Sequence, residues 1–250
     1  MSKKPYGVLI LHGFTSSLDC VREIEPPLKA LGLPTRMPVL RGHNAESPEA
    51  LRGVTWRDWV TDAESALWDL MAEVEHVIVI GHSMGGLVAL TLAADHREEL
   101  DSIILAAASI QLKTPFSPGK PLNFLTPLLL IIFKQWDLTQ KNYADQSLAQ
   151  YDTNYLWTPS DALCSFFDFI KVTRKRLAEV RAPALVIQSH NDSTVEPKSV
   201  EIIYNQISTP AELKQIVWFE KSEHEMFRDC ERYAIIDVIV KYVHERIGAK

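Results

Sequence analysis

A single serine lies between glycines in the segment GHSMG, residues 81 to 85. The β-branched apolar run Val77 to Ile80 precedes it, and an apolar helical pattern follows at once. A G-x-S-x-G sequence at a strand-to-helix turn is typical of a nucleophile elbow, in which the turn exposes the serine hydroxyl above a sheet. Ser83 could instead cap the helix in a glycine-rich turn, but a cap does not explain the further glycine, Gly86. We therefore predict that Ser83 is a nucleophile.

A serine hydroxyl becomes a strong nucleophile only with a base within hydrogen-bond reach and an acid that orients the base. After a nucleophile elbow, the acid and then a histidine follow the serine in the chain, each just past the end of a strand. Asp192 follows the apolar run Ala184–Gln188, and His224 follows the apolar run Leu213–Phe219. The order predicts a triad in which His224 is the base for Ser83 and Asp192 orients the base.

Other ionisable residues compete for these roles, and each has a structural explanation. Glu196 is an alternative acid, but Pro197 follows it, and a proline there is typical of the first turn of a helix. His190 precedes the candidate acid in the chain, so we expect a structural role for it. The remaining histidine rivals fall within the last predicted helix, at a helix end and in a surface loop: His244, His76 and His96.

The oxyanion that forms when a nucleophile attacks a carbonyl requires backbone N–H donors. The amide of Met84 lies at the amino end of the helix after the serine, where negative charge is favoured. The second donor is expected in the loop after the first strand, LHGFT at residues 11 to 15, in which the amide of Phe14 is placed for this role. We expect His12 to brace that loop rather than to take part in catalysis.

These residues require a scaffold in which short strands alternate with helices. Near-continuous runs of Val, Ile and Leu are typical of parallel strands with helices on both faces. The predicted strands are Tyr6–Leu11, Thr35–Val39, Val77–Ile80, Ser102–Ala106, Ala184–Gln188 and Leu213–Phe219. The predicted helices are a helix from an N-cap at Thr55 to about Glu73, Met84–Asp95, Ser160–Glu179, Glu196–Ile207, Cys230–Ile247 and, interrupted by two prolines, Leu18–Leu31. The alternation predicts an α/β fold with a doubly wound, mostly parallel sheet.

The stretch from about Gln111 to Arg181 departs from this alternation. It contains no convincing strand, three prolines lie in its first part, and a basic helix closes it. We therefore predict a core, residues 1–110 and 182–250, and an inserted cap or lid, residues 111–181. Within the cap, the run Phe124–Phe133 is more apolar than one packed helix face requires. It fits an acyl-chain tunnel, a helix buried between cap and core, or a dimer patch.

The composition is that of a globular chain of 250 residues, with 46% hydrophobic and 23% charged residues. The net charge of −6 disfavours nucleic acid and anionic membranes as partners, and the basic cluster Arg174–Arg176 is typical of a solvated helix end. Three cysteines, Cys20, Cys164 and Cys230, are too sparse for a disulfide framework and lack metal-binding spacing. The first apolar run, Val8–Leu11, is too short for a signal peptide, and no apolar run reaches the ~20 residues of a membrane span. We expect a cytoplasmic protein without a membrane segment.

Six segments together resemble the α/β-hydrolase superfamily, and more closely its bacterial carboxylesterases and monoacylglycerol lipases with a small cap. These segments are LILHGFTSS, the Arg41-Gly42-His43 turn, TWRDWV, GHSMGG, HND and SEHEMF. The resemblance covers almost the whole chain and is weakest in the cap. It implies ester hydrolysis with Ser83 as nucleophile, His224 as base and Asp192 as acid. It also implies that the Phe14 and Met84 amides bind the oxyanion, and that the substrate is a small acyl ester cleaved without a metal or a cofactor.

One departure from the family pattern bears on the alcohol part of the substrate. In the glycerol-ester hydrolases of this group we expect a polar cap residue just before a Thr-Pro step, but here Leu156 and Trp157 precede Thr158-Pro159. This difference favours a broader, more apolar ester specificity. Monoacylglycerol lipase, thioesterase, feruloyl-type esterase and acyltransferase remain alternatives, because all of them use the same triad. A non-catalytic ligand-binding homologue is a further alternative, which the intact triad disfavours.

Overall fold

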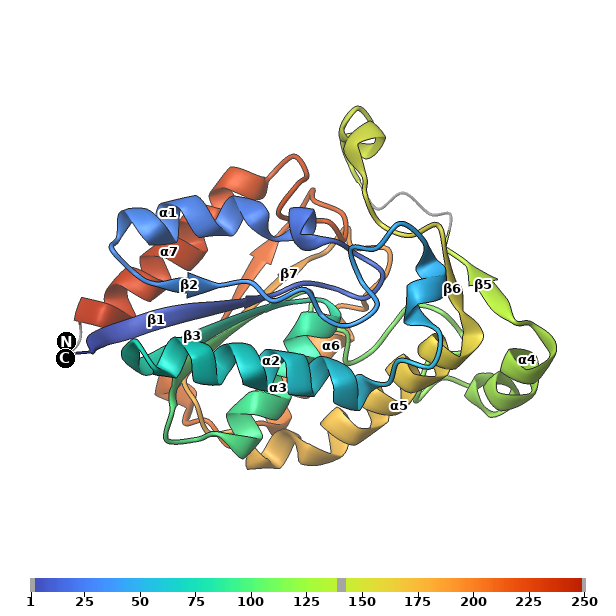
Figure 1. Cartoon of the computed structure of the whole chain (residues 1–250), viewed down its shortest axis with the longest axis horizontal. Coiled ribbons are helices and arrows are strands. Elements are labelled where there is room, and N and C mark those ends of the chain that lie inside the picture. Colours follow the sequence, from blue (N-terminus) through green and yellow to red (C-terminus); the bar gives the residue numbers. More distant parts are fainter. Residues whose placement is uncertain (1–2, 139–142, 249–250) are drawn as a thin grey trace.

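The computed structural model describes residues 3–138 and 143–248 and contains a central sheet of six strands (Figure 1). Neighbouring strands are all parallel, and their order is β2-β1-β3-β4-β7-β8. The strands are β1 (Lys4–Leu11), β2 (Thr35–Arg36), β3 (Val74–His82), β4 (Leu100–Ala106), β7 (Ala184–Ser189) and β8 (Lys214–Phe219). The predicted doubly wound parallel sheet is therefore confirmed.

Helices cover both faces of the sheet, and alternate strand residues supply the two halves of the core. Val77 and Val79 of β3 belong to one buried cluster, whereas Ile78 and Ile80 belong to the other. The helices of the first cluster include α2 (Trp56–Met71), α3 (Met84–Asp95), α6 (Lys198–Gln206) and a helix that follows the sixth strand of the chain, α5 (Ser160–Arg176), and those of the second are α1 (Glu25–Ala30) and α7 (Arg232–Gly248). Because both faces are covered, the buried parts of the inner strands β1, β3, β4 and β7 read as near-continuous apolar runs rather than as alternating ones.

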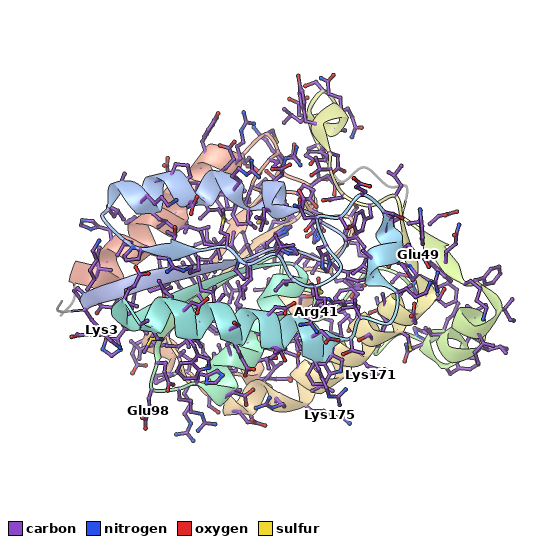
Figure 2. All side chains as sticks on the ribbon, in the orientation of Figure 1. Lys3, Arg41, Glu49, Glu98, Lys171 and Lys175 are labelled. Carbon is purple, nitrogen blue, oxygen red and sulfur yellow. The ribbon has the colours of Figure 1, made fainter. Side chains whose placement is uncertain are left out.

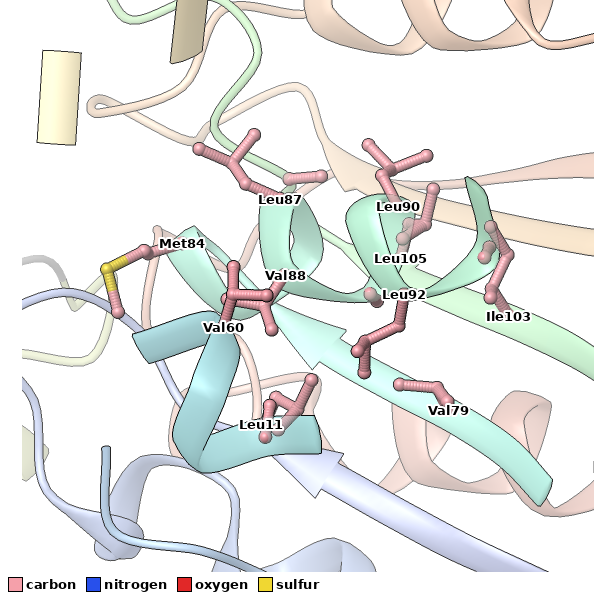
Figure 3. Close-up of a cluster of buried hydrophobic side chains, with 14 of the residues drawn as sticks. Leu11, Val60, Val79, Met84, Leu87, Val88, Leu90, Leu92, Ile103 and Leu105 are labelled. Atoms are coloured by element: carbon pink, nitrogen blue, oxygen red, sulfur yellow. The ribbon is translucent and has the colours of Figure 1, made fainter. Parts of the chain in front are cut away.

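The helix after the candidate nucleophile, α3, is apolar on all sides and fully enclosed. Every residue from Met84 to Ala94 is buried. Figure 3 shows Leu92 of this helix beside Val79 of β3, and Leu90 on the side of Leu105 and Ile103 of β4. A helix that is hydrophobic all round has to lie inside a protein, so the start of α3 is held rigidly at the centre of the molecule.

Two glycines allow the turn before α3 to pack without side chains in the way. A Cβ atom on Gly81 would lie 2.2 Å from the carbonyl oxygen of Gly85, and one on Gly85 would lie 2.3 Å from the carbonyl oxygen of Leu11. Real Cβ atoms do not approach backbone oxygens so closely. The glycines of the GHSMG motif therefore serve the close contact between β1, β3 and the start of α3.

Between β4 and β7, the chain forms a group of elements that lie beyond the carboxyl ends of the strands, except that its last helix runs back along the core (Figure 1). They are α4 (Thr126–Ile132), β5 (Gln135–Asp137), β6 (Trp157–Pro159) and α5 (Ser160–Arg176). The strands β5 and β6 pair in antiparallel fashion, so the prediction that this region contains no strand is wrong. Three residues per strand are too few to give a readable alternation in the sequence. The helix α5 packs against α2 and α3 of the core.

The other predicted elements are present, and the shifts at their ends have local causes. The predicted strand Thr35–Val39 is reduced to two residues, because Pro38 has no N–H to give to a ladder. Pro26 and Pro27 lie in the first turn of α1, where the amide hydrogens have no helical partner to lose. The Thr55 amide donates to Asp58 Oδ2 at 2.9 Å, which caps α2 as predicted.

Charged side chains lie over the outside of the molecule, and the basic end of α5 is one example (Figure 2). Lys171 and Lys175 are exposed, whereas Arg176 pairs with Asp95 at 2.6 Å and with Glu179 at 2.7 Å. The basic cluster is thus partly neutralised by neighbouring carboxylates. In the part of the chain that the structure describes, the helices are too short or too polar to cross a bilayer.

Candidate active site

Ser83 lies at the turn between β3 and α3 in a strained backbone conformation. Its φ of 55° and ψ of −115° are values that a residue with a side chain rarely adopts. Its amide donates to the Ala106 carbonyl at 2.9 Å, and its carbonyl accepts from the amides of Gly86 at 3.0 Å and Ser109 at 3.2 Å. These bonds hold the strained turn between two central strands and the buried helix, as the predicted nucleophile elbow requires.

The structure brings Ser83, His224 and Asp192 together from three separate segments. His224 Nε2 lies 2.9 Å from Ser83 Oγ, and His224 Nδ1 lies 3.0 Å from Asp192 Oδ2. Because a carboxylate only accepts, Nδ1 donates to Asp192 and Nε2 accepts from the serine hydroxyl. Asp192 also accepts from the amides of Thr194 at 2.8 Å and Val195 at 2.9 Å. The carboxylate is therefore fixed in place, and it fixes the tautomer and the plane of the imidazole.

Burial and charge set the ionisation of this pair. Burial alone raises the pKa of the Asp192 carboxyl, but the His224 charge and the hydrogen bonds outweigh it and leave the pKa below its ordinary value. Burial alone lowers the pKa of His224, but the Asp192 charge and hydrogen bond outweigh it and raise the pKa above 6.5. The environment thus favours an ionised acid beside a histidine that takes up a proton readily.

The loop after β1 passes beside Ser83 and is held by His12, as predicted. His12 Nδ1 donates to the Gly13 carbonyl at 2.9 Å, and its Nε2 accepts from the Leu40 amide at 3.0 Å. Burial lowers the pKa of His12 to about 4, which keeps the ring neutral and able to play both parts. A Cβ atom on Gly13 would lie 3.2 Å from Ser83 Cβ, so the loop backbone runs directly against Ser83.

The two predicted oxyanion donors lie on the segments that flank Ser83. Phe14 follows Gly13 in the loop, and Met84 is the first residue of α3. In the described ranges, neither of their amides is hydrogen-bonded to another backbone group outside the regular elements. The Phe14 ring stacks on Phe166 of α5 with centroids 4.8 Å apart, which orients this part of the loop. Both residues thus lie on segments next to Ser83, and their role as oxyanion donors stays a prediction.

A second hydroxyl beside the nucleophile was not predicted. Ser109 Oγ lies 3.0 Å from Ser83 Oγ, and the side chain is completely buried. Since Ser83 donates to His224, Ser109 is the donor in this second bond. The segment after β4, AAASI, is apolar apart from this residue. The sequence signal that could have identified Ser109 was its position, as a polar residue just past the carboxyl end of β4.

The rivals of the triad residues are engaged elsewhere. Glu196 forms an ion pair with Lys120, so the sequence-based preference for Asp192 agrees with the geometry. His190 stacks on Trp218 with ring centroids 4.4 Å apart. His96 Nε2 lies 3.0 Å from Glu64 Oε1, and the two remaining histidine rivals lie in β3 and on the exposed surface of α7: His76 and His244.

A cavity of about 860 Å³ lies over Ser83 and His224, and its lining contains apolar residues, here called the apolar wall, as well as polar residues, here called the polar wall. The apolar wall comes mainly from the β4–β7 region and consists of Leu112, Pro115, Phe116, Leu129, Trp136, Leu138, Leu163, Phe166 and Phe167. The polar wall consists of Thr15, Gln150, Asp152, Asn154, Ser193, Thr194 and Glu225, and the further polar residues Lys113, Thr114, Thr126 and Asp137 come from the same segments as the apolar wall. The cavity can therefore hold a ligand that has both apolar and polar parts, beside Ser83.

The helix α4 borders this cavity with one side and exposes its other side. Thr126 and Leu129 line the cavity. The exposed apolar side chains are Phe124 (75% exposed), Leu128 (57%), Ile131 (68%), Ile132 (60%) and Phe133 (52%), whereas the side chain of Leu130 lies outside the described part of the molecule. The interpretation of this run as a helix buried between cap and core is therefore wrong. The contact of Leu129 with the cavity agrees with the acyl-tunnel interpretation.

A buried carboxylate joins the β4–β7 region to the loop of the candidate base. Asp229 accepts from the amides of Ala144 at 2.8 Å and Asp145 at 3.0 Å. The same side chain accepts from the amides of Glu223 at 2.7 Å and Cys230 at 2.8 Å. Asp229 is fully buried, so these four bonds tie the residue before His224 to the chain that borders the cavity.

The sequence of this chain is similar to known proteins over nearly its full length. Residues 3–231 match the family described as serine aminopeptidase, S33. A thermostable monoacylglycerol lipase from Bacillus sp. (strain H-257) is 28% identical over 244 residues, which cover 98% of this chain and 92% of that protein. A carboxylesterase from Bacillus subtilis (strain 168) is 25% identical over 241 residues, which cover 96% of this chain and 91% of that protein.

Solved structures extend the likeness to three dimensions. One, from work on two metagenome-derived lipolytic enzymes, superposes with a TM-score of 0.82 at 25% identity and covers 97% of this chain and 95% of its own. A soluble variant of monoglyceride lipase from Saccharomyces cerevisiae, in complex with a substrate analog, has a TM-score of 0.80 at 16% identity and covers 98% and 88%. At 16% identity the likeness bears on the fold alone. The family match, which spans most of the chain, establishes that this protein belongs to the S33 family of serine hydrolases with the α/β-hydrolase fold.

Proposed function

We propose that the protein is a serine esterase that hydrolyses carboxylic esters through an acyl-enzyme. The observation that carries the proposal is the chain of two hydrogen bonds from Ser83 Oγ through His224 to the buried Asp192. The S33 family name refers to an aminopeptidase. The two relatives that align with more than nine-tenths of the chain are, by name, a monoacylglycerol lipase and a carboxylesterase, and they favour an ester as the substrate.

The proposed reaction follows the proton positions in the triad. His224 Nε2 takes the hydroxyl proton as Ser83 Oγ attacks the acyl carbon, and Asp192 stabilises the imidazolium that forms. The Phe14 and Met84 amides donate to the oxyanion, for which each donor contributes about 2.7–4 kcal/mol. His224 then gives its proton to the departing alcohol, and afterwards removes a proton from the water that cleaves the acyl-enzyme.

The two walls of the cavity suggest how the substrate lies. We place the acyl chain against the apolar wall, near Phe116, Trp136 and Phe167, and the alcohol at the polar wall, near Asn154 and Thr194. The division predicted from the sequence supports this arrangement, with residues 111–181 acting as a cap over a core of residues 1–110 and 182–250. Leu156 is 66% exposed and offers no hydrogen bond to glycerol, which favours carboxylesterase over monoacylglycerol lipase activity.

A substrate series tests this proposal. The ratio kcat/KM is measured for p-nitrophenyl esters and monoacylglycerols whose acyl chains have two to sixteen carbons. This ratio reports how well the enzyme discriminates between substrates in the transition state. We expect turnover to peak at short or medium acyl chains, without a preference for glycerol esters. A clear preference for monoacylglycerols would show that polar-wall residues recognise glycerol. Turnover of thioesters or amides without turnover of any ester would contradict the proposal.

The activity is expected to depend on pH through His224. A protonated imidazole cannot accept the serine proton, so kcat/KM should rise with pH and reach a plateau above the pKa of the free enzyme. Because Asp192 and Glu223 both raise the pKa of His224, the midpoint should lie above 6.5. The Glu223→Gln variant keeps an acceptor for the Ser193 amide and should lower the midpoint. A midpoint below 6.5 in the wild type would contradict this assignment.

Loss of the second hydroxyl should have a small, specific effect. Ser109→Ala removes the donor that holds Ser83 Oγ in line with His224. A neutral hydrogen bond contributes about 0.5–1.5 kcal/mol, so kcat should fall about 2- to 10-fold with KM nearly unchanged. Steady-state kinetics with one ester, together with the melting temperature, check this. A fall of more than about a thousand-fold would mean that Ser109 carries a proton in the reaction.

A further inference from the structure

Three potential metal ligands meet behind the triad, and the mechanism proposed above uses none of them. They are Cys20, at the end of a short helical turn after β1, His82, at the end of β3, and Glu225, directly after His224. One ligand atom from each lies within 4.8 Å of the other two. All three residues are buried, and Glu225, the most exposed of them, is only 4% exposed. Their closeness results from the fold, because they come from three distant parts of the chain.

The imidazole of His82 is oriented as a metal ligand would be. Its Nε2 lies 2.9 Å from the His224 carbonyl oxygen and must donate to it. Its Nδ1 therefore carries a lone pair, is buried and has no partner among the described residues. That nitrogen faces Gly13, at 3.5 Å from the position of a Cβ there. A metal-binding histidine typically donates its other N–H to a carbonyl or a carboxylate in this way.

The other two candidate ligands, Glu225 and Cys20, also have atoms that are free to bind a metal. Glu225 Oε1 accepts from Asn154 at 2.7 Å, whereas its Oε2 is buried without a partner in the described structure. Cys20 Sγ lies 3.2 Å from Ser16 Oγ. Burial raises the pKa of the Cys20 thiol to about 12 and raises the pKa of the Glu225 carboxyl. Without a ligand, two buried polar atoms of the cluster, His82 Nδ1 and Glu225 Oε2, thus have no hydrogen-bond partner in the described structure, which is costly.

We propose that Cys20 Sγ, His82 Nδ1 and Glu225 Oε2 form an inhibitory site for a divalent cation of the zinc type. Zinc binds thiolate, imidazole and carboxylate ligands together, at about 2.0–2.3 Å, and accepts a water or a hydroxyl as its fourth ligand. Ser16 Oγ is placed to be that ligand. One thiolate and one carboxylate balance the two charges of the ion, so the loaded site is neutral as a buried site must be.

The ion can reach this site through the cavity, and its binding should affect the activity of the protein. His82 and Glu225 both line the cavity over Ser83, so the cation enters through the active site. Binding releases the protons of Cys20 and Glu225, which makes it stronger at higher pH. The ion engages Glu225 beside Asn154 and polarises the His82 N–H that bonds to the His224 backbone. Both effects disturb the candidate base, and activity should fall.

Metal binding is tested directly with cobalt on the full chain, because Co²⁺ reports a thiolate ligand by a near-ultraviolet charge-transfer band. We expect one equivalent of Co²⁺ to give this band, and Zn²⁺ to abolish it by displacement. Cys20→Ser should remove the band and weaken Zn²⁺ binding in equilibrium dialysis by at least about 100-fold, more than the loss of an outer partner would. Cys164→Ser and Cys230→Ser are the matched controls, and both should bind as the wild type does.

The inhibitory effect rests on the proposed esterase function, but the binding measurement does not. Zn²⁺ should inhibit ester turnover in the concentration range in which it binds, a chelator should restore activity, and Cys20→Ser should be resistant. Glu225→Gln provides a second variant if Cys20→Ser does not fold. Absence of a stoichiometric cobalt band, or a band that survives Cys20→Ser, would overturn the site and leave water as the occupant. Absence of ester turnover with an intact band would overturn only the proposed function.

Discussion

Replacement of Ser83 by alanine is expected to lower kcat for ester hydrolysis by about a million-fold, as the loss of a triad nucleophile does in other serine hydrolases. The reason is that His224 then has no hydroxyl to deprotonate, although the oxyanion amides and the cavity are left intact. The small change in volume at an already strained position should leave the fold unchanged. Active-site titration and steady-state rates with the best ester of the series measure the effect.

The hydroxyl of Ser109 provides the control for the Ser83→Ala prediction. Ser109 is only 3.0 Å from Ser83, so Ser109→Ala tests whether any hydroxyl at this place supports turnover. We expect the small loss given above for Ser109→Ala and near-complete loss for Ser83→Ala, with similar melting temperatures. If Ser83→Ala kept more than a hundredth of the wild-type rate while Ser109→Ala lost it, the nucleophile would be misassigned.

The second large effect is expected on stability. Gly85→Ala would place a methyl group 2.3 Å from the Leu11 carbonyl oxygen and 2.8 Å from that of His12. Both contacts are with backbone, at the last residue of β1 and at the residue after it, and backbone cannot turn aside as a flexible side chain can. Overpacking of this kind costs about 3 kcal/mol or more, a large share of the ~5–15 kcal/mol that stabilises a domain. We expect the melting temperature to fall by about 6–12 °C or more.

The control for this prediction is the same substitution at a glycine with free space. A Cβ atom on Gly248, in the last turn of α7, would have open space for 4 Å around it. Gly248→Ala should change the free energy of unfolding by less than about 0.5 kcal/mol. Thermal unfolding followed by circular dichroism compares the two variants. If the melting temperature of Gly85→Ala stayed close to that of Gly248→Ala, the close packing around the nucleophile turn would be refuted.

The positions of the three candidate triad residues could be predicted because each residue lies shortly after an apolar run in the sequence. The strain at Ser83 needs glycines on both sides, and Asp192 and His224 each follow a run that reads as a buried strand. Parallel strands bring their carboxyl ends to one edge of the sheet, so the order in the chain was enough to place the three residues together. The strand alternation likewise predicted the sheet, because burial on both faces leaves a continuous apolar pattern.

The parts that could not be predicted depend on contacts between distant segments. Ser109 gains its role only because β4 lies beside β3, and its sequence context is a run of alanines. The cluster around Glu225 needs a cysteine more than two hundred residues earlier in the chain, and no spacing rule connects the two. The short strands β5 and β6 are held by pairing with each other and by the packing of α5, not by a pattern of their own.

Asp229 has a consequence for attempts to change specificity by recombination. A chimera that takes the region bordering the cavity from a relative would replace residues 144 and 145. The backbone amides of these two residues donate hydrogen bonds to the Asp229 side chain. A foreign segment whose backbone ran elsewhere, or that had proline at these places, would remove two of the hydrogen bonds of this buried side chain, next to the loop that carries His224. The cavity-forming region and the histidine loop should therefore be exchanged together, as one inherited unit, and crossover points are best placed outside both.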